Sequence, residues 1–242
     1  MGSTYEPKQF WESRLDRYFS LKGVGHIGFS ESYNKYLYKR KKRVIEYALK
    51  DIELKKKSVL DIGCGTGFFI DWYLQHGANV CGIDITNISI ERLKQKYQCN
   101  ECEFYLQDIT SLDYKLNKKF DIVNMWDVIY HIIEPNHFEQ ALDNITNSIK
   151  DNGLLLFTDW FGFSSDKKIA NHVQARCLDT YKESLSKRGF KLVEIYPLYN
   201  YLNRPHLGRF DNYLGWLYLF LDNHLQNRVT DNLSLGIWRY SK

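Results

Sequence analysis

The sequence predicts an α/β protein with a seven-stranded, mostly parallel sheet and helices on both of its faces. From residue 58 onward, short apolar runs alternate with stretches whose apolar residues recur every three or four positions. Strands that alternate with helices in this way form parallel sheets covered on both faces. The length of 242 residues also suits one such domain with a short appendage.

Residues 1–50 are expected to form a helical N-terminal arm or lid, and residues 51–242 the main domain. Within the arm, apolar and aromatic residues between 32 and 49 recur at helical spacing, and Ser32 is the expected N-cap. A glycine-punctuated segment, 23–28, precedes this helix.

The expected strands are 58–62, 79–84, 102–106, 120–125, 154–159, 191–196 and 233–240, the last of them antiparallel. The expected helices are 68–76, 88–97, 137–150 and 171–188. Residues 197–232 break the alternation and are expected to form a helical insertion with an aromatic-rich segment at 211–224. This segment can be interpreted as a helix that packs on the sheet edge or as a wall of the acceptor pocket.

Composition excludes several classes of protein. Five scattered cysteines and a lone Cys99-x-x-Cys102 pair predict neither a disulfide framework nor a metal site, and favour a reducing compartment. The longest apolar run, 213–221, is far shorter than the roughly 20 residues of a membrane span, and the polar N-terminus lacks a signal peptide. A cytoplasmic protein is therefore expected.

The formal net charge of +4 is too mild for a dedicated nucleic-acid binder. Basic runs occur at 39–43 and 55–57. They can be interpreted as a solvated helix face and a loop, or as a patch for a phosphate-bearing acceptor.

The strongest motif is a glycine-rich turn after the first strand. The apolar strand carries Asp61, and Gly63, Gly65 and Gly67 follow it. Glycines allow the backbone to approach a ligand closely at the start of a helix, where free N–H groups are available. Phe68 stands where a dinucleotide fingerprint needs its third glycine, and the Asp61 carboxylate would repel a phosphate. A nicotinamide-dependent oxidoreductase is therefore disfavoured.

The segment Val59-Leu-Asp-Ile-Gly-Cys-Gly-Thr-Gly67 resembles the class I S-adenosylmethionine-dependent methyltransferases, and the resemblance extends over residues 58–160. In that family the glycine loop cradles the methionine part and the ribose of the cofactor. The resemblance implies that Asp84 binds the ribose hydroxyls, that Ile85 lines the adenine site, and that Asp108 accepts a bond from the adenine amino group. Trp126 and Asp127, at the end of the fourth strand, should face the cofactor or the transferred methyl group. The implied cofactor-binding set is Asp61, Gly63, Cys64, Gly65, Gly67, Asp84, Ile85, Asp108, Ile109, Trp126 and Asp127.

Transfer to a hydroxyl also requires a base, and His131 is the candidate because histidine titrates near neutral pH. It follows the fourth strand, one turn past Asp127 if that segment is helical. His26, Tyr33 and Tyr36 are candidate substrate-binding residues of the arm, which in the resembled family closes over the cofactor.

The acceptor is expected to be a hydroxyl, amine or carboxylate of a small molecule or glycan. The fourth strand ends in Asp127-Val-Ile-Tyr130 instead of the Asp-Pro-Pro-Tyr type of signature that enzymes acting on base amino groups carry, and no Pro-Cys dipeptide occurs. Nucleic acid is therefore the less favoured acceptor. An RNA methyltransferase and a non-catalytic cofactor-binding regulatory subunit remain alternatives, and the sequence predicts no oligomeric state.

Overall fold

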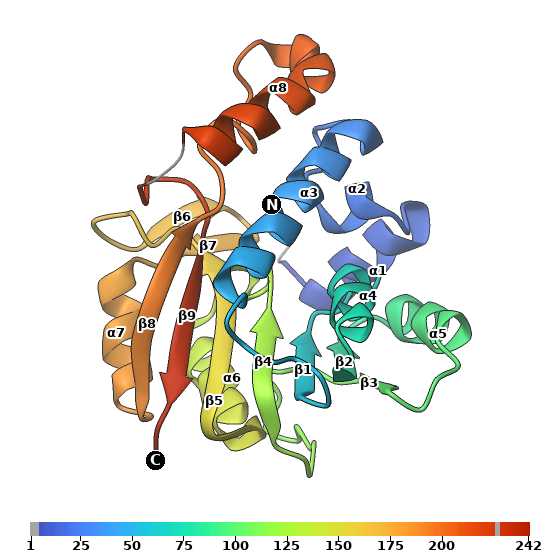
Figure 1. The fold of residues 1–242 in the computed structure, drawn as a ribbon, viewed down its shortest axis with the longest axis vertical. Helices are drawn as coiled ribbons and strands as arrows, with labels where there is room; N and C mark the ends of the chain where they lie inside the picture. The colour runs from blue at the N-terminus through green and yellow to red at the C-terminus, as the bar shows by residue number, and fades with distance from the viewer. Residues whose placement is uncertain (1–4, 226–227) are drawn as a thin grey trace.

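The computed structural model describes residues 5–225 and 228–242, and its centre is a seven-stranded sheet of order β3-β2-β1-β4-β5-β9-β8 (Figure 1). The strands are β1 (Ser58–Ile62), β2 (Asn79–Asp84), β3 (Cys102–Leu106), β4 (Phe120–Met125), β5 (Ile149–Asp159), β8 (Phe190–Pro197) and β9 (Ser234–Tyr240). β9 runs antiparallel to both of its neighbours, while the pairs from β3 to β5 are parallel. The predicted fold class is thereby confirmed.

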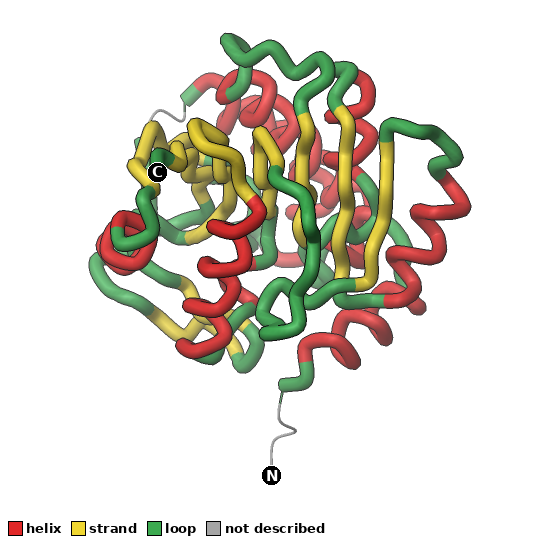
Figure 2. The backbone as a smooth tube through the Cα atoms, turned by 90° about the horizontal axis from the view of Figure 1, so that it is seen from below, coloured by secondary structure: helices red, strands yellow, loops and turns green. Residues whose placement is uncertain are grey.

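Helices cover both faces of the sheet (Figure 2). Alternation along the strands builds two cores, because successive side chains point to opposite faces. On one face, Val59 packs in a cluster with α3 (Glu31–Ala48), α4 (Phe68–Gln75) and α5 (Asn87–Lys96). On the other, Leu60 packs in a cluster with α6 (Pro135–Ser148) and α7 (Leu178–Ser186). Because β1, β2, β3 and β4 run parallel to one another, their carboxyl ends lie at the same edge of the sheet.

The N-terminal arm consists of α1 (Pro7–Arg17), α2 (Leu21–Val24) and α3. The N-cap of α3 is Ser30, whose hydroxyl accepts a hydrogen bond from the Tyr33 N–H at 3.2 Å. The expectation that Ser32 would cap this helix was wrong by half a turn. Serine is a favoured N-cap residue, so both positions fit the preference. With Ser30 as the cap, the acidic Glu31 lies in the first turn of the helix, where a carboxylate is stabilising.

One expected helix begins seven residues later than predicted. Residues 171–188 were expected to be helical, but α7 begins at Leu178 and a small hairpin precedes it, formed by β6 (Lys167–Ala170) and β7 (Val173–Ala175). Asp166 accepts hydrogen bonds from the Cys177 N–H at 2.9 Å and from the Thr180 hydroxyl at 2.7 Å. These bonds fix the chain direction at the start of α7. β7 has three residues, too few to establish a two-residue period in the sequence.

The C-terminal insertion contains the short 3-10 helix η2 (Gly208–Phe210) and α8 (Asp211–His224), which packs beside α3. The expected aromatic segment therefore has the predicted bounds. The close approach of the two helices depends on Gly215, where an added Cβ would lie 3.1 Å from Tyr33 and closer still to Tyr36. Within the residues that the structure describes, no helix has both the length and the apolarity to cross a bilayer.

Candidate functional site

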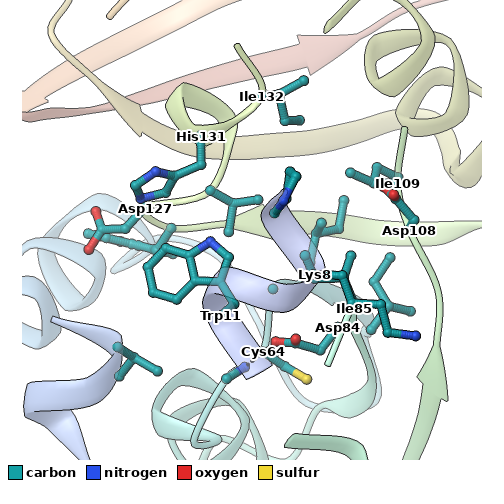
Figure 3. Close-up of a pocket in the computed structure, with 18 of the residues that line it drawn as sticks. Lys8, Trp11, Cys64, Asp84, Ile85, Asp108, Ile109, Asp127, His131 and Ile132 are labelled. Carbon is teal, nitrogen blue, oxygen red and sulfur yellow. Dashed lines mark hydrogen bonds between the residues drawn. The ribbon is translucent and has the colours of Figure 1, made fainter. Parts of the chain in front are cut away.

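A cavity of about 860 Å³ opens at the carboxyl ends of β1, β2 and β4 (Figure 3). In parallel α/β sheets ligands bind in this position, where the loops after the strands converge. One half of the cavity is lined by the glycine loop and the acids that follow β2 and β3. The other half is lined by residues of α1, α3 and the 3-10 helix η1 (Ile129–His131), which follows β4.

The glycine loop forms the floor of the first half. Gly63 and Gly65 have positive φ values of 70° and 51°, in the left-handed region that favours glycine. A Cβ at Gly63 would overlap the side chain of Val128, and one at Gly65 would lie 2.8 Å from Val24. The backbone therefore approaches the opposite wall as closely as glycine allows. Gly67, with φ of 82°, is the N-cap of α4 and does not line the cavity.

Asp84 is a buried acid at the end of β2 whose carboxylate lines the cavity. It accepts hydrogen bonds from the Gly65 N–H at 2.9 Å and from the Thr86 N–H and hydroxyl at 2.9 and 2.7 Å. Burial raises the pKa of Asp84, although these donors oppose the shift. Three of the roughly four acceptor sites of a carboxylate are thereby used, so the oxygen that accepts from Gly65 can still accept from a ligand hydroxyl.

Asp61, at the end of β1, is a second buried acid in the cavity wall. It accepts a hydrogen bond of 2.6 Å from the side-chain amide of Asn124 on β4. Burial raises the pKa of Asp61 to about 7, an effect that the Asn124 bond opposes and the nearby Asp84 increases. A cationic group in the cavity would favour the ionised form, because an opposite charge offsets the cost of burial.

The predicted adenine side of the cavity is lined by Ile85, Asp108 and Ile109. Asp108 is exposed, and one of its oxygens accepts from the Thr110 N–H and hydroxyl, at 2.8 and 2.7 Å. Ile109 is buried and belongs to the core beneath the loop. Cys64, also buried, completes the lining between the glycine loop and β2.

At the end of β4, Trp126 and Asp127 line the cavity, and Asp127 lies beside His131 and Trp11 (Figure 3). Trp126 stacks on Phe69 of α4, with ring centroids 4.6 Å apart. Asp127 adopts the left-handed conformation, with φ of 56°, and its carboxylate forms an ion pair with the buried Lys41 of α3. Such strain in a non-glycine residue costs about 1–3 kcal/mol and tends to occur at functional sites. The Thr158 hydroxyl donates to the same carboxylate at 3.0 Å.

His131 lies in the second half of the cavity, where its ring meets that of Trp11 edge to face at 4.9 Å (Figure 3). Its Nδ1 is 2.7 Å from the backbone carbonyl oxygen of His172. A carbonyl oxygen can only accept, so Nδ1 carries the proton and Nε2 of the neutral ring keeps its lone pair. Burial lowers the pKa of His131 to about 4, which keeps the ring neutral at physiological pH.

Helix α1 covers the cavity and is held there by Glu12. The Glu12 carboxylate accepts hydrogen bonds from the N–H groups of Asn87 and Ile88, at 2.8 and 3.0 Å. It thereby caps α5, whose own N-cap, Thr86, makes no side-chain cap bond. Lys8 and Trp11 of the same helix point into the cavity (Figure 3).

Three residues of the arm that were expected to bind substrate, His26, Tyr33 and Tyr36, do not line the cavity. His26 is exposed, and its Nδ1 accepts from the Gly28 N–H at 3.2 Å. Tyr33 is fully buried, where it stacks on Phe29, and both tyrosines lie against α8. The arm contributes Trp11, Tyr38 and Lys41 instead. Tyr38 and Lys41 lie on a different face of α3, which the apolar spacing alone does not distinguish.

The basic run 39–43 is also not a uniformly solvated face. Arg40 is buried and donates to the carbonyl oxygens of Pro197 and Leu198, at 3.1 and 2.9 Å. Lys41 is buried against Asp127, while the other three members of the run are exposed. Only part of this run is therefore free to meet solvent or a ligand.

Comparison with known proteins identifies a family described as "Methyltransferase domain", which matches residues 33–195. Among curated proteins, the chain is 29% identical over 123 residues to a ubiquinone biosynthesis O-methyltransferase of Coxiella burnetii (47% of this chain, 48% of the relative). It is 32% identical over 108 residues to the enzyme of the same name from Haemophilus ducreyi (42% and 44%). The chain thus spans about half the length of the curated relatives it matches.

Among solved structures, magnesium protoporphyrin IX methyltransferase from Synechocystis PCC 6803, with bound S-adenosylhomocysteine, has a TM-score of 0.67 and 16% identity. The match covers 97% of this chain and 98% of that one. N-methyltransferase NodS from Bradyrhizobium japonicum WM9, in complex with the same compound, has a TM-score of 0.63 and 14% identity, covering 96% and 99%. At these identities the likeness concerns the fold.

Proposed function

The chain belongs to the class I S-adenosylmethionine-dependent methyltransferases, and from that premise we propose that it methylates an oxygen or nitrogen atom of a small molecule. The observation that carries the proposal is the cavity itself. It has a half lined by the glycine loop, Asp84 and Asp108, and a second half lined by Trp11, Lys41 and His131. The open space in the second half favours a catalytic protein, because in a regulatory subunit we would expect side chains to fill the space for an acceptor.

The first half fits the cofactor chemically. Asp84 keeps an acceptor site for a ribose hydroxyl, and Asp61 supplies a negative charge near the glycine loop for an ammonium group. The cradle formed by Gly63 and Gly65 has no room for side chains. When bound, S-adenosylmethionine supplies an electrophilic methyl group on a sulfonium centre. The proposed holders are the residues named for this half, and Ile85 and Ile109 would line the adenine site.

The chain's own contribution to the chemistry is alignment, exclusion of water and removal of a proton. Trp11 and Trp126 are flat apolar groups that would orient the acceptor and exclude water. Nε2 of His131 would accept the proton of an acceptor hydroxyl, while the His172 carbonyl holds the ring. A base whose pKa is about 4 matches an acidic hydroxyl, such as that of a phenol, better than an aliphatic alcohol.

The names of similar proteins support a small-molecule acceptor. The two curated relatives are named for ubiquinone biosynthesis, and one of the similar solved structures is named for magnesium protoporphyrin IX. A glycan acceptor fits the same aromatic half, because sugar rings stack on aromatic faces. RNA is less favoured: of the basic runs, only Lys41 faces the cavity, and Asp127 already pairs with it.

A test of the acceptor class incubates the purified chain with methyl-labelled S-adenosylmethionine and a cell extract separated into RNA, protein, glycan-lipid and small-molecule fractions. We expect label in the small-molecule fraction. Label in the glycan-lipid fraction would retain the methyltransferase and change the acceptor. Label confined to RNA would refute the proposed acceptor class, and the same assay with denatured protein controls for uncatalysed methylation.

A further inference from the structure

Helix α8 directs both of its aspartates inward and three of its four aromatic residues outward, whereas an ordinary surface helix turns its charged side to solvent. Its two carboxylates, Asp211 and Asp222, are fully buried. Asp222 accepts hydrogen bonds from the backbone N–H groups of residues 200–202, at 2.8–3.0 Å. Asp211 accepts from those of residues 206–207 and from the Tyr218 hydroxyl. Both carboxylates therefore accept hydrogen bonds from the loop that precedes α8. Neither of them adds charge to the outer side of this helix.

The outer side of α8 carries large exposed apolar groups. Tyr213, Trp216 and Phe220 are 78%, 57% and 55% exposed, and Phe210, which directly precedes the helix, is 57% exposed. Their spacing of three or four residues places them on one side of the helix. We call these four residues the aromatic stripe. Contiguous exposed apolar surface of this kind marks an interaction site, whereas scattered single residues do not.

Cations border the aromatic stripe. Helix α3 lies beside α8 (Figure 1), and its outward side carries four exposed basic residues. These are Lys35, Lys39, Lys42 and Arg43. Two acids lie along this side of α3: Glu46 pairs with Lys42 at 3.8 Å, and the Glu31 carboxylate accepts hydrogen bonds from the Ser20 hydroxyl and the Lys22 N–H. Arg209 adds a further exposed cation directly before the stripe. An apolar surface bordered by positive charge is complementary to an anionic, partly apolar partner.

We propose that the aromatic stripe and the basic side of α3 bind the surface of an anionic phospholipid membrane. Trp and Tyr favour the interfacial layer of a bilayer, and Lys and Arg favour its anionic head groups. With 14 residues, α8 is long enough to lie in the interface and too short to span it. A second copy of the chain is less complementary, since a two-fold contact through the stripe would bring two cationic borders together.

Membrane binding at this surface is a property separate from methyl transfer, but it would also affect which acceptors reach the cavity. Helix α3 has Lys39 on its outward side and Tyr38 and Lys41 in the cavity. The proposed membrane surface is therefore one helix away from the acceptor half. Binding there would bring the cavity close to acceptors that partition into lipid.

The test measures co-sedimentation of the full chain with vesicles of phosphatidylcholine alone and of phosphatidylcholine mixed with phosphatidylglycerol. We expect binding to the mixed vesicles to be roughly tenfold stronger, and to weaken as salt is added. The combined variant Tyr213→Ser, Trp216→Ser and Phe220→Ser should lose most of this binding. The matched control Leu112→Ser, which removes a side chain that is 86% exposed elsewhere, should bind like the wild type.

A second measurement does not depend on the folding of the triple variant. Brominated lipid in the mixed vesicles should quench tryptophan fluorescence in the wild type and less in Trp216→Phe, which preserves the apolar surface. Absence of binding to both vesicle types, equal binding to both, or equal quenching in Trp216→Phe would overturn the proposal. Light scattering that shows a dimer in the wild type and a monomer in the triple variant, without vesicle binding, would assign the stripe to a second copy.

Discussion

Lys41 of α3 and Asp127 at the end of β4 form an ion pair inside the cavity, where their side chains are 3% and 17% exposed. Burial lowers the pKa of Lys41, but the Asp127 carboxylate more than compensates, so the net shift is upward. Lys41 therefore stays protonated at neutral pH. The ion pair connects the N-terminal arm to the end of β4 in the wall of the cavity.

Replacing one partner of this pair should cost more stability than replacing both. Lys41→Met leaves a largely buried carboxylate without its cation, which typically costs about 3–5 kcal/mol. The double variant Lys41→Met, Asp127→Asn removes both charges and should recover part of that loss. Urea unfolding of the two single variants and the double variant measures the coupling. If the losses of stability in the two single variants add up to the loss in the double variant, the two side chains are not energetically coupled.

Glu12 should hold α1 over the cavity and so slow the exit of the cofactor. Glu12→Ala removes two hydrogen bonds to the start of α5, worth about 1 kcal/mol each. We expect S-adenosylhomocysteine to dissociate several-fold faster from this variant in stopped-flow fluorescence. Glu91→Ala, which removes an exposed glutamate on α5 itself, is the control. Equal dissociation rates in the wild type and Glu12→Ala would refute the role of this contact.

His131→Ala should lower turnover by about 10²-fold if this residue removes the acceptor proton. Cofactor affinity should not change, because His131 lies in the other half of the cavity. Calorimetric titration with S-adenosylhomocysteine provides that comparison. Unchanged turnover in His131→Ala would exclude the residue as the base.

The pH profile gives an independent check on His131. A base must be unprotonated to act, and burial lowers its pKa to about 4. As the pH falls, kcat/KM should therefore decline near pH 4, and this residue should cause no decline near its unperturbed value of about 6.5. A decline centred near 6.5 that disappears in His131→Gln would contradict the effect of burial described here.

Gly63→Ala should damage the glycine loop beyond the cost of its backbone conformation. Gly63 and Gly208 have similar φ values of 70° and 62°, but a Cβ meets Val128 at the first and nothing within 4 Å at the second. Gly208→Ala should cost about 1 kcal/mol, from the backbone alone. Gly63→Ala should cost about 1–3 kcal/mol more, from overpacking. Thermal unfolding measures both losses of stability. Adding Val128→Ala to Gly63→Ala should recover the part that comes from overpacking. Equal losses at the two glycines would contradict the close approach of Gly63 to Val128.

The sequence predicted the parallel part of the sheet well, because buried strands produce continuous apolar runs bounded by turn residues. The bounds of β1 to β4 match those expected from the pattern. The hairpin of β6 and β7 was missed, since strands of three and four residues are too short to show alternation. That hairpin and its turn contribute Lys168 and Asn171 to the cavity lining, so part of the site was missed with it.

The arm shows a different limit of prediction. Periodicity predicted that residues 32–49 form a helix, and α3 has nearly those bounds. Which face of the helix meets the cavity depends on its partner, and α8, far away in the sequence, occupies the face of Tyr33. Tyr38 and Lys41 consequently line the cavity in place of Tyr33 and Tyr36. A buried lysine paired with a distant aspartate has no signature in the local sequence.

Binding of S-adenosylmethionine through Asp84, the acid at the end of β2, can be measured by calorimetric titration of the cofactor into the wild type and Asp84→Ala. We expect one bound cofactor per chain in the wild type. In Asp84→Ala we expect affinity roughly tenfold to a hundredfold lower, because charge-assisted hydrogen bonds are lost. Asp51→Asn, an exposed acid outside the cavity lining, should leave affinity unchanged. If the wild type binds no cofactor, or if Asp84→Ala binds it as tightly as the wild type, Asp84 does not hold the cofactor in this cavity.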